Sequence, residues 1–214
     1  MIAYIVNILL LNNNPTFRSK SKGPQCLFKV TPRRTILEKQ IQILNRSFKG
    51  CQISIIEDYK NKKIKNIIKS ISNVSIIENQ YFDITNCLYN ISLGLYKNID
   101  DLLILPGNTY FPPNIFNGFN RKHSQIWITN EIYDIGCSIN NGLIENIMWG
   151  LPNYWTNIGY FTGKELEMLK NICNKENIKK LFFFEGINYC INNGGEFHAV
   201  YKNNITMINK SLDV

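Results

Sequence analysis

The sequence predicts an α/β fold in which a single doubly wound, mostly parallel sheet carries a small hairpin-type antiparallel insertion. Short apolar runs alternate with amphipathic helical stretches through the first half of the chain, which is the pattern of parallel strands joined by crossover helices. The run Leu102 to Leu105 is apolar at every position, as expected of a central strand buried on both faces. The 214 residues contain no linker, repeat or change in composition, so we expect one domain over residues 1–214.

The first half of the chain supplies the parallel strands and their helices. An Ile/Val/Leu run over residues 2–11 predicts the first strand, which ends in the turn cluster Asn12-Asn13-Asn14-Pro15. Thr35 followed by Glu38 is a capping-box pattern, and apolar residues recur after it at helical spacing, so a helix is predicted to begin after Thr35. The same alternation predicts strands at 51–56 and 74–77, and helices at 61–70 and 87–96.

The second half of the chain changes to a hairpin pattern after the central strand. Strands are predicted at 125–130, 134–139 and 143–148, with Asn140-Asn141-Gly142 as the turn between the last two. Helical spacing follows, and then two short apolar runs close the chain. We expect these helices at 163–173 and 179–192, and the closing strands at 196–201 and 205–208.

Composition and charge exclude several classes of protein. Hydrophobic residues make up 44% and charged residues 19%, which excludes a disordered chain and gives no membrane signature. The net charge of +8 would favour polyanions. However, the Lys and Arg residues fall in separate segments (18–34, 60–69 and 175–180) and do not alternate with aromatic residues as in a single-strand binding groove. We therefore interpret the charge as a solvated basic surface and expect no nucleic-acid partner.

The cysteines and the N-terminal residues bear on the compartment. Six cysteines stand singly without a C-x-x-C pair, which argues against a zinc site and for reduced thiols in a cytoplasmic compartment. Residues 1–11 are apolar, but they lack a basic start and a cleavage site and are too short to span a bilayer. We therefore interpret them as part of the first strand, with a signal peptide as the alternative. Asn, Ile and Lys are frequent and Ala is scarce, which indicates an AT-rich coding sequence, typical of a viral or fast-evolving source.

Seven segments follow one another in an order found in a known family of enzymes. In chain order they are Leu11-Asn-Asn-Asn-Pro-Thr-Phe-Arg18, Pro24-Gln-Cys-Leu-Phe-Lys-Val30, Ile36-Leu-Glu-Lys-Gln-Ile-Gln-Ile-Leu44, Ile55-Ile-Glu-Asp-Tyr59, Asn79-Gln-Tyr-Phe-Asp-Ile-Thr-Asn-Cys-Leu-Tyr-Asn-Ile-Ser-Leu93, the central strand with Gly107-Asn108, and Ile205-Thr-Met-Ile-Asn-Lys-Ser-Leu-Asp213. Together they resemble the nucleotidyltransferases of the sugar-phosphate and phosphocholine cytidylyltransferase type. In that family the first strand runs into L-A-A-G-x-G-x-R and the last reads W-x-E-I-D-T-x-E-D.

The resemblance covers nearly the whole chain and implies a Rossmann-like, GT-A-like sheet of the nucleotide-diphospho-sugar transferase kind. It implies a ligand site at the carboxyl ends of the first and central strands, which is where open α/β sheets bind ligands. The family-equivalent nucleotide-binding positions are Asn12, Asn14, Thr16, Arg18 and Gly107. The acceptor-side candidates are Asp83, Asn86 and Glu185.

Three positions depart from the family's pattern of charged groups. The family has a Lys where this chain has Gln25, and it has two metal-binding Asp residues where this chain has Asn108 and Asn209. Mg²⁺ prefers anionic oxygen ligands, so a carboxamide is a poor substitute. Lys20, Lys22 or Lys29 could reach the place of the missing Lys. The amide side chains at these three positions are similar in shape to the family's Lys and Asp side chains, but they carry no charge.

These departures lead us to hypothesise a degenerate nucleotidyltransferase-fold protein: a non-catalytic binding, structural or assembly module without a cofactor. Its partner would be a nucleotide, a small phosphorylated molecule or another protein. The alternative is an active nucleotidyltransferase with Mg²⁺ as cofactor, acting on phosphocholine or a sugar phosphate. A glycosyltransferase of related fold ranks last, because Pro106-Gly107-Asn108 lacks a D-x-D motif.

The remaining chemistry-bearing residues form no recognisable motif. His123 and His198 stand alone in the sequence, and no metal-type spacing links them. Trp149, Trp155 and Tyr160 could line an acceptor pocket, although aromatic residues at this density more often belong to the core.

Overall fold

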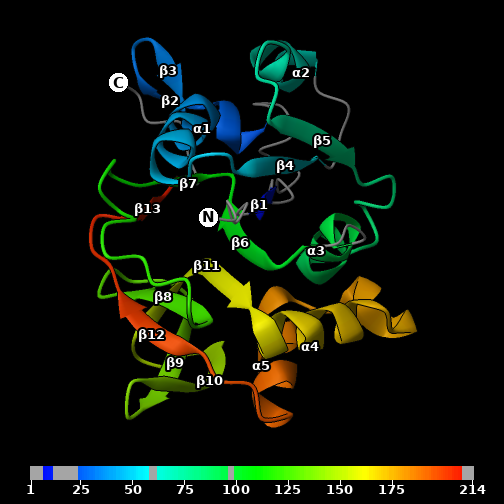
Figure 1. Cartoon of the computed structure of the whole chain (residues 1–214), viewed down its shortest axis with the longest axis vertical. Coiled ribbons are helices and arrows are strands. Elements are labelled where there is room, and N and C mark those ends of the chain that lie inside the picture. Colours follow the sequence, from blue (N-terminus) through cyan, green and yellow to red (C-terminus); the bar gives the residue numbers. More distant parts are fainter. Residues whose placement is uncertain (1–6, 12–23, 58–61, 96–98, 209–214) are drawn as a thin grey trace.

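The structure is a computed structural model, and it describes residues 7–11, 24–57, 62–95 and 99–208. Within these residues nine strands form one sheet, in the order β5-β4-β1-β6-β11-β8-β12-β10-β9 (Figure 1). Its strands are β1 (Asn7–Leu11), β4 (Gln52–Glu57), β5 (Val74–Glu78), β6 (Asp101–Pro106), β8 (Gln125–Thr129), β9 (Ile135–Asn140), β10 (Leu143–Trp149), β11 (Tyr154–Thr162) and β12 (His198–Tyr201). Two small two-stranded sheets join β2 (Lys29–Thr31) to β3 (Arg34–Thr35) and β7 (Thr109–Tyr110) to β13 (Thr206–Met207).

The helices connect these strands in the predicted order. They are α1 (Ile36–Ser47), α2 (Lys62–Ile68), α3 (Cys87–Gly94), α4 (Gly163–Cys173) and α5 (Phe183–Asn192), with short 3₁₀ helices η2 (Gln25–Leu27) and η3 (Glu176–Lys180). The capping box that begins α1 is confirmed: the Glu38 backbone N–H donates to Thr35 Oγ1, and the Thr35 backbone N–H donates to Glu38 Oε2.

The parallel half of the sheet is confirmed. β5, β4, β1 and β6 run parallel, with Leu11 opposite both Ile56 and Pro106. All six residues of β6 are buried, as expected for a central strand covered on both faces. The carboxyl ends of β1 and β6 therefore meet at the same edge, which we call the carboxyl edge.

The other half of the sheet contains a strand that the sequence did not reveal. β11 lies between β6 and β8 and runs antiparallel to both. β12 then pairs with β8 in parallel, and the predicted hairpin β9–β10 closes the sheet. Asn141 and Gly142 have φ values of 50° and 80°, the left-handed conformations that a two-residue hairpin turn requires.

One predicted helix divides into two. The stretch 179–192 was expected to be continuous, but the chain forms η3 and then α5, with Leu181 and Phe182 between them. The carbonyl of Leu181 accepts the backbone N–H of Leu88, and the carbonyl of Lys179 accepts that of Asn86. The amino end of α3 thus takes the hydrogen bonds that a continuous helix would have used.

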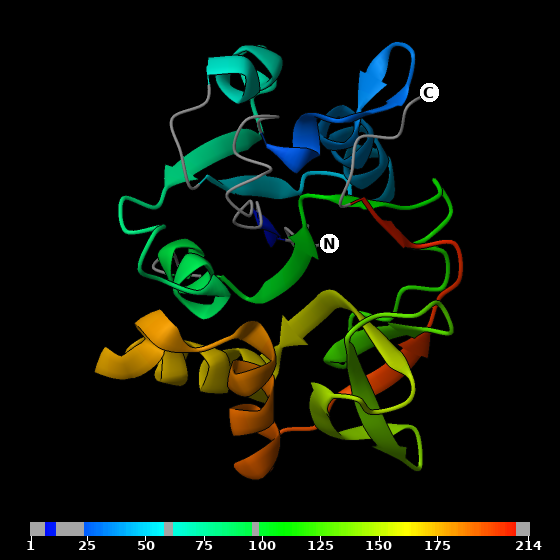
Figure 2. The same ribbon diagram turned by 180° about the vertical axis from the view of Figure 1, so that it is seen from behind.

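Helices cover both faces of the sheet, and each face has its own apolar core. One core joins the sheet to α3, α4 and α5, with Leu88, Leu169 and Ile187 among its buried residues. The other joins it to α1, α2 and the segment 111–119. The two views place α2 and β5 at one end of the molecule and β9 and β10 at the other (Figures 1 and 2). No helix among the described residues is long and apolar enough to cross a membrane.

Candidate functional site

The turn after the central strand lies where the sequence placed it. Pro106 is opposite Leu11, and the backbone N–H of Gly107 donates to the carbonyl of Leu11. Gly107 and Asn108 are both buried. Asn12, Asn14, Thr16 and Arg18 follow Leu11 and lie outside the described residues. Leu11, the residue that precedes this segment in the sequence, therefore lies beside Gly107.

A buried side chain from α1 holds this turn in place. Gln40 is 1% exposed, and its Nε2 donates to the carbonyls of Pro106 and Thr109 at 2.9 and 2.7 Å. The two bonds span the turn and fix its width, because one planar amide group supplies both donors. Gln40 was present in the motif quoted above, but the sequence alone gave it no role.

The end of the described chain returns to the same turn. β13 pairs with β7, and the backbone N–H of Ile208 donates to the carbonyl of Asn108 at 2.9 Å. Asn209 is the next residue and lies outside the described residues. The fold thus brings Ile208, which precedes Asn209 in the sequence, to Asn108.

Gln25 lies on the α1 side of the carboxyl edge. It begins η2, which packs against α1, and the carbonyl of Phe28 just after η2 accepts the backbone N–H of Ile36. Glu57, 1% exposed at the carboxyl end of β4, is a buried acid near this position that the sequence did not single out. Burial, with a smaller contribution from the Glu57 carboxylate, raises the pKa of Cys26 to about 12. A buried carboxylate therefore lies next to η2.

An open pocket of about 310 Å³ lies at the carboxyl end of β8 and the beginning of β11. We call it the edge pocket; its lining is Glu131, Ile132, Tyr133, Asp134, Ile135, Trp155, Asn157, Thr206 and Met207. Because β11 runs antiparallel to β6, its first residues lie at the carboxyl edge. β13, which supplies Thr206 and Met207, pairs with β7 just beyond Asn108. The pocket therefore adjoins the Gly107–Asn108 turn.

A bulge in β11 shapes one wall of the edge pocket. The register shifts between Trp155 and Gly159, and Asn157 within the bulge has a φ of 59°. The indole Nε1 of Trp155 donates to the carbonyl of Ile158 at 3.1 Å, which stabilises the bulge from inside. Bulges redirect side chains and are common beside active sites. Here the bulge places an amide in the pocket wall.

Tyr133 joins the two segments that form the opposite wall. Its hydroxyl donates to the carbonyl of Ile205 at 2.9 Å. Burial, and to a smaller extent the Glu131 carboxylate, raises the pKa of Tyr133 to about 12. The hydroxyl therefore stays protonated and serves as a hydrogen-bond donor that anchors the segment leading to β13.

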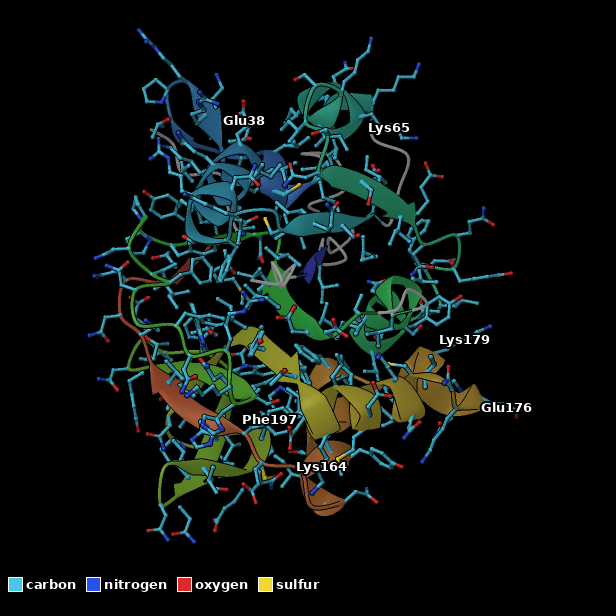
Figure 3. The ribbon with its side chains drawn as sticks, in the orientation of Figure 1. Glu38, Lys65, Lys164, Glu176, Lys179 and Phe197 are labelled. Carbon is cyan, nitrogen blue, oxygen red and sulfur yellow. The ribbon has the colours of Figure 1, made fainter. Side chains whose placement is uncertain are left out.

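The acceptor-side candidates lie beside α3, and two of them have structural bonds. Asn86 Nδ2 donates to the carbonyl of Lys180 at 2.6 Å, and Glu185 Oε2 accepts the backbone N–H of Phe182 at 2.7 Å. Asp83 is exposed in the loop after β5. The ring centre of Tyr81, in the same loop, lies 4.9 Å from the ammonium of Lys179 in η3. Figure 3 labels Lys179. Asn86 thus joins the start of α3 to η3, and Glu185 caps the amino end of its own helix, α5.

A buried polar network fixes the base of that loop. Asn79 is 2% exposed, and its Nδ2 donates to Thr85 Oγ1 and Asn90 Oδ1 at 2.9 and 2.7 Å. Its Oδ1 accepts the backbone N–H of Tyr81 at 2.8 Å. The asparagines of this motif therefore position the loop.

The aromatic candidates divide between surface, pocket and core. Trp155 lines the edge pocket, whereas Trp149 is 53% exposed on β10. Tyr160 is fully buried, and its hydroxyl donates to Asp101, which also forms an ion pair with Arg121. Of the three, only Trp155 contributes to a pocket at the carboxyl edge.

The described residues do not fit a Mg²⁺ site of the family's kind. At the end of β6 the side chain is the carboxamide of Asn108, and no group of three or more His, Cys, Asp or Glu side chains in the described part of the chain is placed to hold a metal ion. Mg²⁺ sites usually use one or two carboxylates together with phosphate oxygens. The donor set at this turn is neutral.

No family model and no curated protein matches the sequence. Solved structures do match the fold. The inositol-1-phosphate CTP transferase from T. maritima has a TM-score of 0.75 at 14% identity, over 99% of this chain and 92% of that one. The CTP:phosphocholine cytidylyltransferase from Streptococcus pneumoniae has a TM-score of 0.73 at 14% identity, over 98% and 95%. The nucleoside-diphosphate-sugar pyrophosphorylase from Vibrio cholerae has a TM-score of 0.73 at 13% identity, over 95% of each chain. The chain therefore has the Rossmann-like fold of the nucleotidyltransferases.

Proposed function

We propose that this protein binds a nucleotide or a small phosphorylated molecule at the carboxyl edge and does not catalyse Mg²⁺-dependent nucleotidyl transfer. The observation that carries the proposal is Asn108: a buried carboxamide stands at the end of the central strand, where the resemblance implies a metal-binding carboxylate. Similar structures named as CTP transferases and pyrophosphorylases support the fold on which this comparison depends.

The chemistry of nucleotidyl transfer explains why this position matters. Attack on the α-phosphorus builds negative charge on phosphoryl oxygens, and cations, metal ions and backbone N–H groups stabilise that charge. Removing one such group typically lowers the rate by about 10²- to 10³-fold. Gln25 in place of the family's Lys removes a cation, and Asn108 removes an anionic metal ligand. The fold's geometry is kept while its ionic groups are absent at these positions.

Binding a ligand at the carboxyl edge requires fewer charged groups than catalysing nucleotidyl transfer does. The backbone at the carboxyl edge is held by Gln40 and by the bond from Gly107 to Leu11, so it is ordered before a ligand arrives. The edge pocket of about 310 Å³ offers the carboxylates of Glu131 and Asp134 and the amide of Asn157. Carboxylate and amide oxygens accept hydrogen bonds, so they suit a ligand rich in hydroxyl or amino donors.

Calorimetric titration tests the proposal. CTP, UTP and ATP are titrated into the unmodified protein with Mg²⁺ and again with EDTA. Weak binding with the same affinity under both conditions is expected.

The triple variant Gln25→Lys, Asn108→Asp and Asn209→Asp should gain Mg²⁺-dependent affinity and a Mg²⁺-dependent rise in melting temperature, because a ligand of the folded state stabilises it. The exposed substitution Asn114→Asp is the control for added negative charge. Tight binding by the unmodified protein that disappears on adding EDTA would exclude the proposal.

The alternative is an active enzyme whose metal ligands have moved. Three acids at the carboxyl edge favour it: Glu131 and Asp134 in the edge pocket, and the buried Glu57 at the end of β4. If the protein were active, Glu131→Gln or Asp134→Asn would abolish pyrophosphate release, whereas Asp83→Asn in the exposed loop would not.

A further inference from the structure

A second cavity lies on a face of the sheet, over β8 and β12, and shares no residue with the edge pocket. It measures about 150 Å³; its lining is Gly118, Phe119, Asn120, His123, Gln125, Trp127, His198, Val200 and Lys202. One water occupies about 30 Å³ in the liquid, so there is room for a tetrahedral oxyanion. The lining contains two imidazoles and one ammonium group but no carboxylate.

The two histidines of the chain meet in this cavity. His198 begins β12 opposite Gln125, and His123 precedes β8. Their ring centres lie 4.6 Å apart, with an angle of 41° between the planes. No sequence pattern links them, because 74 residues of other elements lie between them. The parallel pairing of β12 with β8 brings these two potential hydrogen-bond donors together.

Lys202 brings a cation without a counterion to the same cavity. Its ammonium lies 5.3 Å from the ring centre of Trp127 and donates to the carbonyl of Asn117 at 3.2 Å. It forms no ion pair with any described residue. Partial burial lowers the pKa of Lys202, as expected for a cation that has lost water without gaining an anion.

The indole of Trp127 forms part of the cavity wall. Its side chain is fully buried, and its indole Nε1–H makes no hydrogen bond within the described part of the chain. Buried N–H groups without an acceptor are rare because they lose their bonds to water. Because Nε1 is itself buried, the indole contributes its ring and not this N–H to the surface of the cavity.

The surface next to this cavity is positively charged, like the cavity itself. An open depression of about 650 Å³ shares Gly118 and Phe119 with the cavity and is lined on its other side by Arg46, Lys49 and Arg121. No Asp or Glu side chain lines it. Arg121 is paired with Asp101, which leaves the charges of Arg46 and Lys49 to attract an anion.

We propose that the cavity of His123, His198 and Lys202 binds an oxyanion, a phosphate or sulfate group that is free or carried by a small molecule. The ammonium of Lys202 supplies the charge and the imidazoles supply further donors, because hydrogen bonds between charged partners are the strong ones. The site does not depend on the function proposed for the carboxyl edge, since it uses different residues on a different part of the sheet.

Proton NMR of the imidazole rings tests this directly, because the untagged chain has two histidines and both line the cavity. Sodium sulfate is titrated at constant pH and constant ionic strength, with sodium chloride as the balancing salt. Saturable shifts of both histidine signals are expected in the unmodified protein. Lys202→Met keeps the aliphatic stem over Trp127 and should weaken binding by about tenfold or more, the equivalent of one charge-assisted hydrogen bond.

Two matched variants separate a built site from general surface charge. Lys202→Arg keeps the charge and should retain binding, and Lys122→Gln removes a nearby exposed charge that does not line the cavity and should change nothing. Shifts that grow without saturation, or that weaken equally in Lys122→Gln and Lys202→Met, would overturn the proposal. Titration with cytidine monophosphate distinguishes the sources: tighter saturation than with sulfate assigns the group to a small phosphorylated molecule, and weaker saturation assigns it to the free ion.

Discussion

Gln40 shows how one residue can control the geometry of a whole edge of the sheet. Its side chain comes from the buried stripe of α1 and bonds to both ends of the turn that follows β6. The two bonds offset the cost of burying the Nε2 donor, and they fix the helix and the turn relative to each other. The position of Asn108 thus depends on a residue far away in the sequence.

Replacing the Gln40 side chain should lower the free energy of unfolding by more than the size of the side chain suggests. Gln40→Met keeps the volume but leaves the carbonyls of Pro106 and Thr109 buried without their donor, at about 1–3 kcal/mol for each group. We expect a loss of about 2–4 kcal/mol in the free energy of unfolding, measured with urea. Gln42→Met, on the same helix but only half-buried, should change it by less than about 0.5 kcal/mol. Equal losses in both variants would show that Gln40 acts through helix stability alone.

Some of these residues could have been found from the sequence. Gln40 interrupts an apolar stripe with Leu37 and Leu44, and a polar residue there signals a buried hydrogen bond. Gly107 and Asn108 were found because they end an apolar strand. Glu57 gave no signal, since an acid at the end of a strand is usually exposed, and only tertiary packing shows that it is 1% exposed.

At the scale of elements, local sequence patterns predicted the helices whose ends are set by interactions between residues close in the sequence. The capping box predicted the start of α1, and helical spacing predicted α4 at its exact bounds. β11 was missed because its strand-forming residues carry no regular alternation: the bulge between Trp155 and Gly159 breaks the period of two. The edge pocket was missed for the same reason, since β11 forms one wall of it.

The bulge itself gives a test at this scale. Asn157 has a φ of 59°, a conformation that Asn tolerates and β-branched residues do not. Asn157→Val should lower the free energy of unfolding by about 1–2 kcal/mol or more, whereas Asn157→Gly should be nearly neutral. Thermal unfolding followed by circular dichroism measures both. If the two variants unfold at the same temperature, the left-handed bulge is not required for the fold.

At the scale of the whole molecule, buried thiols and phenols couple stability to pH. Burial is the main cause that raises the pKa of Cys26, Cys137, Cys173 and Cys190 from 9.0 to about 12. Burial likewise raises the pKa of Tyr133 and Tyr160 from 10.0 to about 12. Because the folded chain keeps these protons longer than the unfolded chain, their contribution to stability is complete below about pH 9 and is lost as the pH rises toward 12.

The free energy of unfolding should therefore depend steeply on pH in alkaline solution. In the presence of a reducing agent, the free energy of unfolding should fall between pH 9 and 12, with up to about 1.4 kcal/mol per pH unit from each group. Cys137→Ala removes one such group, so its slope over this range should be shallower than that of the unmodified protein, whatever its absolute stability. A free energy of unfolding that stays constant from pH 8 to 11 would contradict the burial of these groups.

The central claim is that a nucleotidyltransferase fold is retained here without metal-dependent transfer. The most direct measurement is pyrophosphate release by the unmodified protein from CTP, UTP or ATP, with phosphocholine or a sugar phosphate as acceptor and with Mg²⁺ present. We expect no release above a control without protein, because the resemblance implies that Gln25 and Asn108 stand in place of a cation and a carboxylate that the reaction uses. Robust Mg²⁺-dependent release would contradict the claim and would identify Glu131, Asp134 and Glu57 as the acids to replace first.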